Sequence, residues 1–532
     1  MIDRRVRKLL TSVAMCTACA ASADALPQIR SILNAASYAQ PGLPNSGIAR
    51  GSVFVVFGSD LGPPDLVQAA GFPLQASLGG TSMRVTVGST TVDALLLYAW
   101  KNQVAAVLPS ATPEGIGLLE VTYNGHAGQA GAFRVVRSSP GVLTQNQAGT
   151  GQALAMNFNS AADQPRNTLS RPAKTGQVVT VWATGLGPIV GSDAVVPVSS
   201  DLNINLQLLV GGKSATVRYK GRSGCCSGVD QITFEVPAGV SGCYVPMLVQ
   251  VDNVVSNFTT ISVADGNSND CSDLTGIPGP MLEKLQSGGT LRAGSIVLAV
   301  FKGDTVTESG TGQFFQADLN LLNSLISLGL PSPGSCMVNP VKPVSSGFTP
   351  PQGLDAGPVF NVTGPKGSRQ VLQRYMGMYS ESFANGTVVQ FLEPGAYTAD
   401  SASGGADVGP FHATLSFPAE LTSTVQQSAM GTTVTWRGGD PQGYVVIQGS
   451  AQSPAGASTN FSCVERTSAG QFAIPPYLLA SLPAPPGGVT AMTAAGTSPQ
   501  NRFQARGLDF GFFSFCSPLT ALCGPASFYF DY

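Results

Sequence analysis

Charged residues are scarce in this chain: Asp, Glu, Lys and Arg make up 11% of its 532 residues, less than half of the usual quarter or so. Only two histidines occur, His126 and His412, so the sequence offers very few candidates for a histidine-based catalytic triad or a multi-histidine metal site. No long uncharged apolar run of the kind that forms a membrane helix follows the N-terminal region. No basic cluster suits nucleic acid. We therefore expect no catalytic, cofactor or metal residues and no nucleic-acid partner.

The N-terminus has the three-part order of a secretory signal peptide. Four basic residues within 4–8 precede a moderately apolar stretch over 9–20, and small residues follow up to Ala25. The stretch is too short for a membrane helix of about 20 residues. We expect residues 1–23 to be removed and the protein to be secreted or at the cell surface, without a transmembrane segment. Cys16 or Cys19 would be the attachment point if the chain is lipid-anchored instead.

The remaining composition predicts an all-β fold. Hydrophobic residues (43%) fall in short runs separated by turn residues, and the chain has 63 glycines and 38 prolines. That texture is typical of strands and turns in β-sandwiches. Signal removal takes away four basic residues and one acidic residue, so the net charge moves from −2 to about −5. We predict tandem immunoglobulin-like β-sandwich modules with disulfides.

An internal repeat sets the expected organisation of the first half. The segment 51–63 matches 176–188, at an offset of 125 residues, in a glycine, two valines and a Leu-Gly-Pro ending. Further on, 102–109 matches 230–237 in the same order. Two ordered matches indicate duplication of a unit of immunoglobulin-domain size. We place sandwich modules at 29–138 and 139–265.

The same segments resemble a family of uncharacterised bacterial secreted proteins with tandem TIG/IPT-like immunoglobulin-fold domains. The resemblance also rests on Asn34-Ala-Ala-Ser-Tyr38, on the Cys225-Cys226 pair and on Gly242-Cys243-Tyr244, and it covers about 230 residues. It implies an extracellular pair of β-sandwiches. The family has no assigned catalytic residues to carry over.

The second half predicts two more β-rich modules. The polar segment 266–284 is expected to be a linker. Strand-like runs and turns resume in 285–418, with one short helix expected at 318–330, and a final sandwich module is expected at 419–532.

The cysteines that remain after signal removal are even in number, which favours disulfides in an exported chain. Zinc is the alternative, but no C-x-x-C pair or nearby histidine supports it. Adjacent Cys225 and Cys226 are expected to have different partners, with Cys243 and Cys271 nearest. Cys516 and Cys523 would close a small loop, leaving Cys336 and Cys463 to each other. The connectivity stays open, because four cysteines allow three pairings in each half. The eight cysteines are Cys225, Cys226, Cys243, Cys271, Cys336, Cys463, Cys516 and Cys523.

Three aromatic residues are candidates for ligand contact. Trp100 lies in a loop-like segment, and Trp436 and Tyr444 flank the turn 438–443. Aromatic faces suit sugar or peptide surfaces, although core packing is the competing interpretation for Trp436. We expect a non-catalytic binding, adhesion or structural protein whose partner is a glycan, a matrix polymer or a surface protein. The alternative is a secreted hydrolase that uses Glu393, Asp407 or Asp440 of the C-terminal half.

Overall fold

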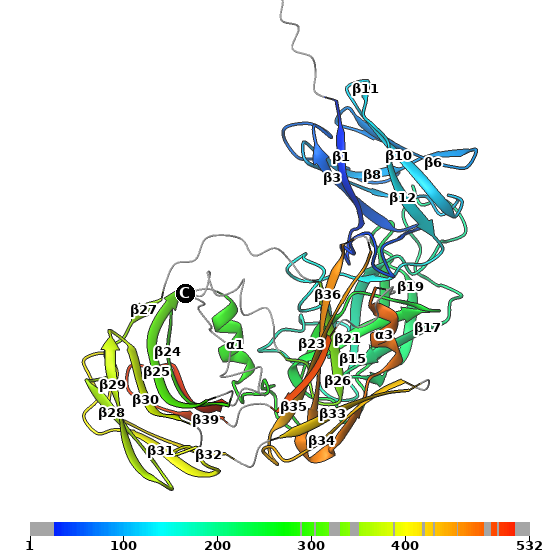
Figure 1. Ribbon diagram of the computed structural model, residues 1–532. Helices are drawn as coiled ribbons and strands as arrows, with labels where there is room; N and C mark the ends of the chain where they lie inside the picture. The colour runs from blue at the N-terminus through cyan, green and yellow to red at the C-terminus, as the bar shows by residue number, and fades with distance from the viewer. Residues whose placement is uncertain are drawn as a thin grey trace, which may run out of the picture.

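The computed structural model describes residues 26–287, 290–302, 305–318, 330–340, 351–386, 389–417, 421–428, 431–454, 456–483, 491–496 and 500–516. Seven sheets account for most of these residues, so the predicted all-β fold is confirmed (Figure 1). The expected signal peptide and most of the expected helix at 318–330 lie outside the described residues. The helices of the described part are α1 (Gly279–Gln286), the 3₁₀ turn η1 (Thr467–Ala469) and α3 (Pro476–Ser481).

Sandwich 1 consists of two sheets packed face to face, with orders β1-β3-β9-β8-β4 and β2-β12-β10-β6-β5; β11 pairs with β10 and β7 with β6. Its core joins side chains of both sheets, such as Phe54 and Val104 from one and Met83 and Leu119 from the other. Its strands are β1 (Gln28–Asn34), β2 (Ile48–Ala49), β3 (Val53–Ser59), β4 (Val67–Gln68), β5 (Ser77–Leu78), β6 (Thr81–Val87), β7 (Thr90–Asp93), β8 (Leu95–Trp100), β9 (Gln103–Val107), β10 (Gly115–Tyr123), β11 (His126–Ala127) and β12 (Gly131–Val136).

Sandwich 2 follows directly, with sheet orders β13-β15-β20-β19-β16 and β18-β17-β21-β22; β14 pairs with β15 and β23 with β21. Val181 and Phe234 of one sheet share a core with Met247 and Val249 of the other. Its strands are β13 (Gly141–Val142), β14 (Ala155–Asn157), β15 (Val178–Thr184), β16 (Ser200–Asp201), β17 (Leu206–Val210), β18 (Lys213–Ser214), β19 (Thr216–Arg222), β20 (Asp230–Glu235), β21 (Gly242–Val251), β22 (Val254–Val255) and β23 (Thr259–Val263).

The repeated sequence segments form equivalent strand pairs in the two sandwiches. In sandwich 1, β3 pairs antiparallel with β9, and in sandwich 2, β15 pairs antiparallel with β20. The leucine of each Leu-Gly-Pro ending, Leu61 or Leu186, is fully buried. The repeat is therefore a pair of neighbouring core strands and the turn that closes one end of the core.

A ten-stranded sheet, called the long sheet, dominates the next part of the chain (Figure 1). Its order is β32-β31-β28-β29-β30-β25-β24-β40-β39, and β27 pairs with β25. Phe314, Phe360 and Tyr397 contribute to the core on one of its faces. Its strands are β24 (Thr290–Lys302), β25 (Val306–Asp318), β27 (Gln352–Gly353), β28 (Val359–Gly364), β29 (Gly367–Tyr375), β30 (Met378–Gly386), β31 (Gly395–Ser401), β32 (Phe411–Phe417), β39 (Gln500–Phe503) and β40 (Phe510–Cys516).

The last two sheets, called the C-terminal pair, have orders β26-β36-β35-β38 and β33-β34-β37. Their core includes Leu209, Leu248 and Phe258 of sandwich 2, so sandwich 2 and the C-terminal pair are packed as one body. The strands are β26 (Ser335–Pro340), β33 (Thr422–Ser428), β34 (Gly431–Arg437), β35 (Tyr444–Gln452), β36 (Ser458–Arg466), β37 (Gln471–Ala473) and β38 (Ala491–Gly496).

Sheet membership corrects the expected division of the second half into consecutive modules 285–418 and 419–532. Strand β26 comes from the first of these segments but pairs with β36 of the second, and β40 of the second pairs in parallel with β24 of the first. The two segments therefore exchange strands. Strand order of this kind is decided by long-range pairing, which hydrophobic patterning along the chain does not encode.

The segment 266–284 is also more than the solvated linker that its polar composition suggested. Cys271 is buried and disulfide-bonded to Cys243. Ile277 and Leu282 are buried in a cluster that includes Phe512 of the long sheet. This segment therefore packs between sandwich 2 and the long sheet.

A buried polar network joins the two sandwiches. Arg222 and Asp230 are cross-strand partners at the ends of β19 and β20 and form an ion pair through Nη1 and Oδ1. Nη2 of Arg222 donates to the carbonyl of Gly51 in sandwich 1 at 2.6 Å and to that of Gly187 at 3.1 Å. Asp193 of sandwich 2 accepts the backbone N–H of Ser110 in sandwich 1 at 2.6 Å. These bonds fix one sandwich against the other.

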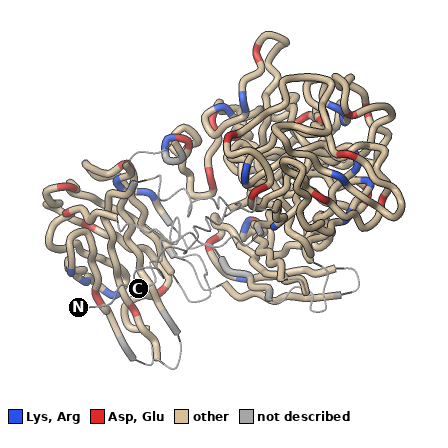
Figure 2. The backbone as a smooth tube through the Cα atoms, turned by 90° about the horizontal axis from the view of Figure 1, so that it is seen from above, with Lys and Arg blue, Asp and Glu red and all other residues tan. Residues whose placement is uncertain are grey.

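In the view of Figure 2, blue Lys and Arg positions and red Asp and Glu positions are scattered along the backbone tube. In the described part of the chain, we find no helix with the length and hydrophobicity needed to span a bilayer.

Candidate ligand-binding site

The disulfides differ in part from the expected pairing. Cys336 and Cys463, cross-strand partners on β26 and β36, are bonded to each other as expected. Cys225 is bonded to its neighbour Cys226, and Cys243 is bonded to Cys271, so the expectation that the adjacent cysteines reach different partners is wrong. The reason lies in placement: Cys243 and Cys271 are buried together, whereas Cys225 and Cys226 sit on an exposed turn. Cys516 is disulfide-bonded, and its expected partner Cys523 lies outside the described residues.

The structure separates the three aromatic candidates. Trp100 ends β8 of sandwich 1 with 40% of its surface exposed, and its Nε1 donates to the carbonyl of Pro64 at 2.8 Å. Trp436 is 5% exposed and donates from Nε1 to the carbonyl of Thr467 at 2.7 Å. The interpretation of Trp436 as a ligand contact is therefore corrected: it is a core residue of the C-terminal pair. Tyr444 remains, half-buried at the start of β35.

Tyr444 lines an open recess of about 250 Å³ where three parts of the chain meet, here called the Tyr444 recess. Sandwich 2 and the segment after it supply Tyr244, Asp265 and Asp273. The C-terminal pair supplies Tyr444 and Arg466. The other lining residues are Ser241, Gly242, Cys243, Ser272, Leu274, Leu330, Ser332 and Pro333.

Strand pairing positions Tyr444 and Arg466, the aromatic and the charged residue that the C-terminal pair contributes to the recess. Tyr444 and Arg466 lie directly opposite each other on β35 and β36, although 22 positions separate them in sequence. The guanidinium carbon of Arg466 lies 5.7 Å from the centre of the Tyr444 ring, within the range of a cation–π contact. The contact holds the ring at the edge of the recess.

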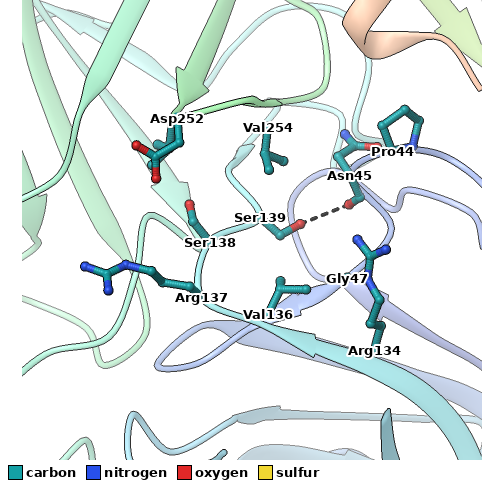
Figure 3. Close-up of a pocket in the computed structure, with 11 residues that line it drawn as sticks. Pro44, Asn45, Gly47, Arg134, Val136, Arg137, Ser138, Ser139, Asp252 and Val254 are labelled. Carbon is teal, nitrogen blue, oxygen red and sulfur yellow. Dashed lines mark hydrogen bonds between the residues drawn. The ribbon is translucent and has the colours of Figure 1, made fainter. Parts of the chain in front are cut away.

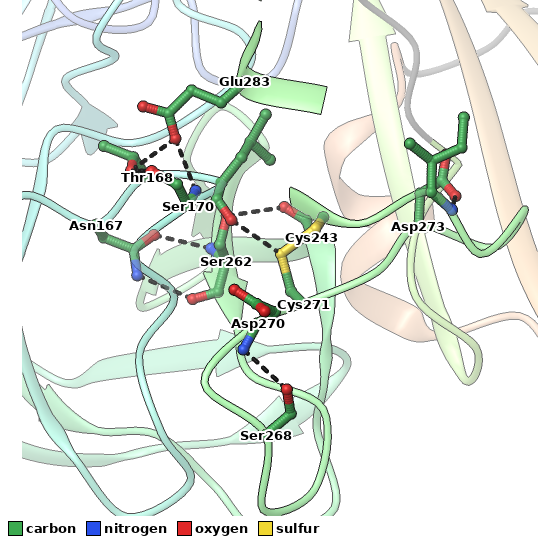
Figure 4. The surroundings of a disulfide bond; sticks show 12 residues. Asn167, Thr168, Ser170, Cys243, Ser262, Ser268, Asp270, Cys271, Asp273 and Glu283 are labelled. Atoms are coloured by element: carbon green, nitrogen blue, oxygen red, sulfur yellow. Dashed lines mark hydrogen bonds between the residues drawn. A yellow bond between two sulfur atoms is a disulfide. The ribbon is translucent and has the colours of Figure 1, made fainter. Parts of the chain in front are cut away.

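The opposite wall is held by the disulfide between Cys243 and Cys271 (Figure 4). The backbone N–H of Cys243 donates to the carbonyl of Ser272 at 3.1 Å, and the Ser262 hydroxyl donates to the carbonyl of Cys243 at 3.0 Å. Glu283 of α1 accepts the N–H of Ser170 at 2.7 Å and ties the following helix to sandwich 2. The disulfide and the Glu283 bond therefore fasten the segment after sandwich 2 to sandwich 2 on this side of the recess.

Asp273 organises the turn at the base of this wall. Its Oδ1 accepts the backbone N–H groups of Thr275 and Ile277, each at 2.9 Å, and the Thr275 hydroxyl at 2.7 Å. Burial raises the pKa of this carboxyl above its usual value, and the three hydrogen bonds and Arg502 act against that rise. The recess thus combines two carboxylates and one guanidinium with tyrosine rings and serine hydroxyls.

A second recess of about 210 Å³ lies at the junction of the two sandwiches, here called the Arg134 recess (Figure 3). Arg134 stands beside Asn45 and Gly47 at one side, and Arg137 and Asp252 lie toward the other. The remaining lining residues are Pro44, Val136, Ser138, Ser139, Val251 and Val254.

The carboxylates of the hydrolase alternative each have a structural partner. Glu393 pairs with Lys366 at 3.4 Å, Asp407 accepts the N–H of Asp355 at 2.9 Å, and Asp440 accepts the N–H of Gln442 at 2.9 Å. Within the described residues, no cluster of three or more His, Cys, Asp or Glu side chains is arranged to hold a metal ion.

Sequence reasoning missed most of both recesses. Arg466 and Tyr244 are isolated in sequence, and only the pairing of β35 with β36 and the packing of the C-terminal pair on sandwich 2 bring them near Tyr444. The Gly242-Cys243-Tyr244 segment belongs to the family resemblance, which assigns it no function. Arg134 lies within β12 and Arg137 directly follows that strand, and no motif marks them.

No protein-family model matches the chain, and neither does any curated protein. Among solved structures it is similar to Bacteroides ovatus SGBP-B of a mixed-linkage glucan utilization locus, in complex with a mixed-linkage heptasaccharide (12% identity, 68% of this chain and 74% of that one, TM-score 0.21). It is also similar to domains 5–6 of the S-layer protein SbsC (12% identity, 45% and 100%, TM-score 0.16). A third is Sidekick-1 immunoglobulin domains 1–4 (11% identity, 93% and 99%, TM-score 0.12). Likenesses this low say nothing about what this chain binds.

The strands, sheets and cross-links define the class of the protein. It is an all-β protein with two tandem two-sheet sandwiches, a ten-stranded sheet, a further pair of sheets and disulfides.

Proposed function

We propose that the protein is an exported, non-catalytic binding protein of the cell surface or extracellular space, and that it holds a surface glycan in the Tyr444 recess. The observation that carries the proposal is the convergence of Tyr444, Arg466 and Tyr244 with two carboxylates in one open recess. A tyrosine ring offers an apolar face to the C–H groups of a sugar, and its hydroxyl remains able to hydrogen-bond.

The size of the recess favours part of a polymer over an enclosed small molecule. Its volume of about 250 Å³ lies below the roughly 300 Å³ at which small-molecule pockets begin. An open site of this size suits one or two units of a chain that continues outside. The carboxylates of Asp265 and Asp273 and the hydroxyls of Ser272 and Ser332 match the hydroxyl groups of a neutral sugar.

Export is proposed on two grounds. Residues 1–23 have the composition of a signal peptide, and structural disulfides persist in oxidising compartments. The test is to fractionate cells that express the full chain and to sequence the N-terminus of the product. A mature N-terminus near residue 24 in the envelope or the medium is expected, whereas an unprocessed cytosolic chain with free thiols would overturn the export proposal.

Binding is tested by affinity electrophoresis of the purified protein in gels that contain neutral polysaccharides, namely a soluble β-glucan and a mannan. We expect at least one polymer to retard the protein. Tyr444→Ala should weaken the retardation by up to about tenfold, because stacked aromatic contacts are worth about 0.5 to 1.5 kcal/mol. Arg466→Gln should weaken it less.

Tyr375→Ala is the matched control, because Tyr375 is a tyrosine of β29 that is 75% exposed and lies outside the recess. Near-ultraviolet circular dichroism of each variant reports whether its fold is retained. Absence of retardation by any surface polymer, or equal loss in Tyr375→Ala, would contradict the proposal. Release of reducing ends from a polymer, abolished by Glu393→Gln or Asp407→Asn, would favour the hydrolase instead.

A further inference from the structure

The Arg134 recess contains two guanidinium groups that take part in no hydrogen bond or ion pair of the described structure. Among the described residues, neither the Arg134 nor the Arg137 guanidinium has a hydrogen-bond or ion-pair partner, and both residues are exposed. The recess contains one carboxylate, that of Asp252, so its formal charge is positive. The chain as a whole has a net charge of −2, and the Tyr444 recess, with two carboxylates and one guanidinium, is negative. The positive charge is therefore local to this recess.

The backbone around these arginines is built to keep the recess in place. The Ser139 hydroxyl donates to the carbonyl of Asn45 at 2.9 Å (Figure 3). The Asn34 side chain donates to the carbonyl of Ser139 at 3.0 Å. A Cβ at Gly47 would lie 2.8 Å from Cγ1 of Val136, so only glycine lets this loop approach β12. The Ser138 hydroxyl donates to Gly185 of sandwich 2 at 3.2 Å. Bonds to both sandwiches thus fix the backbone of Ser138 and Ser139, which follows the two arginines in the chain.

We propose that the Arg134 recess binds a carboxylate-bearing linear saccharide, with Arg134 and Arg137 each taking an acidic group. Guanidinium groups recognise carboxylates through paired N–H donors. Arg134 and Arg137 point to different sides of the recess (Figure 3), which suits acidic groups spaced along a polymer. The Asn45 side-chain amide, which has no partner among the described residues, lines the same recess and matches sugar hydroxyls.

Strand pairing at the recess disfavours an acidic peptide as the ligand. A peptide commonly binds a β-protein by adding a strand to an exposed sheet edge. Here the edge of β12 is already occupied, because Val135 and Val136 pair in parallel with Ile48 and Ala49 of β2. The volume of about 210 Å³ again suits part of a polymer. This inference extends the proposed glycan function to an acidic saccharide, but it uses a different site.

The test is affinity electrophoresis of the full chain with polygalacturonate and with the same polymer after complete methyl esterification. We expect retardation by the acid and none by the ester. Arg134→Gln and Arg137→Gln should each weaken retardation by polygalacturonate about tenfold, and added salt should weaken it further. Arg30→Gln is the matched control, because Arg30 is an exposed arginine of sandwich 1 outside the recess.

Several outcomes would overturn the inference. One is equal retardation by the ester; another is an equal effect of Arg30→Gln, which would indicate unspecific charge attraction. Equally tight binding of polyglutamate, with the same dependence on both arginines, would assign the recess to an acidic peptide. Tyr444→Ala is expected to leave polygalacturonate binding unchanged. Loss of neutral-glycan binding alone would thus refute the proposed function, and loss of polygalacturonate binding alone would refute this inference.

Discussion

The junction of the two sandwiches depends on one buried arginine, and replacing it has a calculable effect. The Arg222 side chain is 1% exposed and the Asp230 side chain is fully buried, so their ion pair is shielded from water. Arg222→Met removes the cation and the bonds to the carbonyls of Gly51 and Gly187. Breaking a buried ion pair by removing one partner costs about 3 to 5 kcal/mol, because the remaining charge is left uncompensated.

The assay is native-state hydrogen exchange, read on peptides that cover β15 and β20, because a single unfolding free energy is poorly defined for a chain of several modules. The opening free energy of these strands should fall by about 3 to 5 kcal/mol in Arg222→Met. The Arg218→Met variant is the control on the same strand. Arg218 pairs with Glu235 at the surface, with 58% of its side chain exposed, so its loss should cost less than about 1 kcal/mol.

A second variant separates the charge effect from packing. Arg222→Met combined with Asp230→Leu removes both buried charges, and apolar replacements of buried pairs are often neutral or stabilising. The double variant should therefore recover much of the loss seen in Arg222→Met. If Arg222→Met and Arg218→Met have the same effect, or if the double variant is as unstable as the single one, the reasoning is refuted.

Three further predictions concern stability. Burial raises the pKa of Asp230 to about 6, although Arg222 and the Leu186 N–H oppose the rise. The stabilisation from the protonated Asp230 carboxyl is present below about pH 4 and is lost as the pH rises through 6. Hydrogen exchange should therefore show the wild type losing stability relative to Asp230→Asn between these pH values, and parallel pH profiles of the two proteins would contradict this. Glu308 is fully buried and accepts the N–H groups of Gln390, Phe391 and Leu392. In hydrogen exchange read on peptides of β25, Glu308→Gln should lower the opening free energy by about 2 to 4 kcal/mol, whereas Glu381→Gln, at an exposed pair with Arg374, should change it by less than about 1 kcal/mol. Replacing both Cys336 and Cys463 by serine should lower the opening free energy of β26 and β36 by about 2 to 4 kcal/mol, and hydrogen exchange of these strands equal to that of the oxidised wild type would show that the bridge is dispensable.

Local patterns were sufficient for the fold class. The alternation of short apolar runs with glycine and proline predicts strands, and the duplicated segments predict two similar units. In the structure these segments become β3 with β9 and β15 with β20. Such features depend on residues near one another in the chain, so the sequence alone reveals them.

Local sequence patterns did not predict which distant strands and cysteines pair with one another. The exchange of β26 and β40 between the two C-terminal segments follows from sheet order. The disulfide of Cys243 with Cys271 follows from their shared burial. Trp436 became a core residue because its strand packs inward, whereas Tyr444, eight positions later, reached the surface.

The amino-acid sequence by itself determined that this protein is a strand-rich chain with a repeated unit and cysteines suited to cross-linking, because hydrophobic spacing, turn residues and composition are local quantities. Only the tertiary structure decided where ligands could bind. Both recesses lie where separate segments meet, with Tyr444 opposite Arg466 and the arginines of β12 and its following segment beside the loop of Asn45. The physical reason is that a binding surface is made by side chains brought together in space, and long-range strand pairing and packing decide which ones meet.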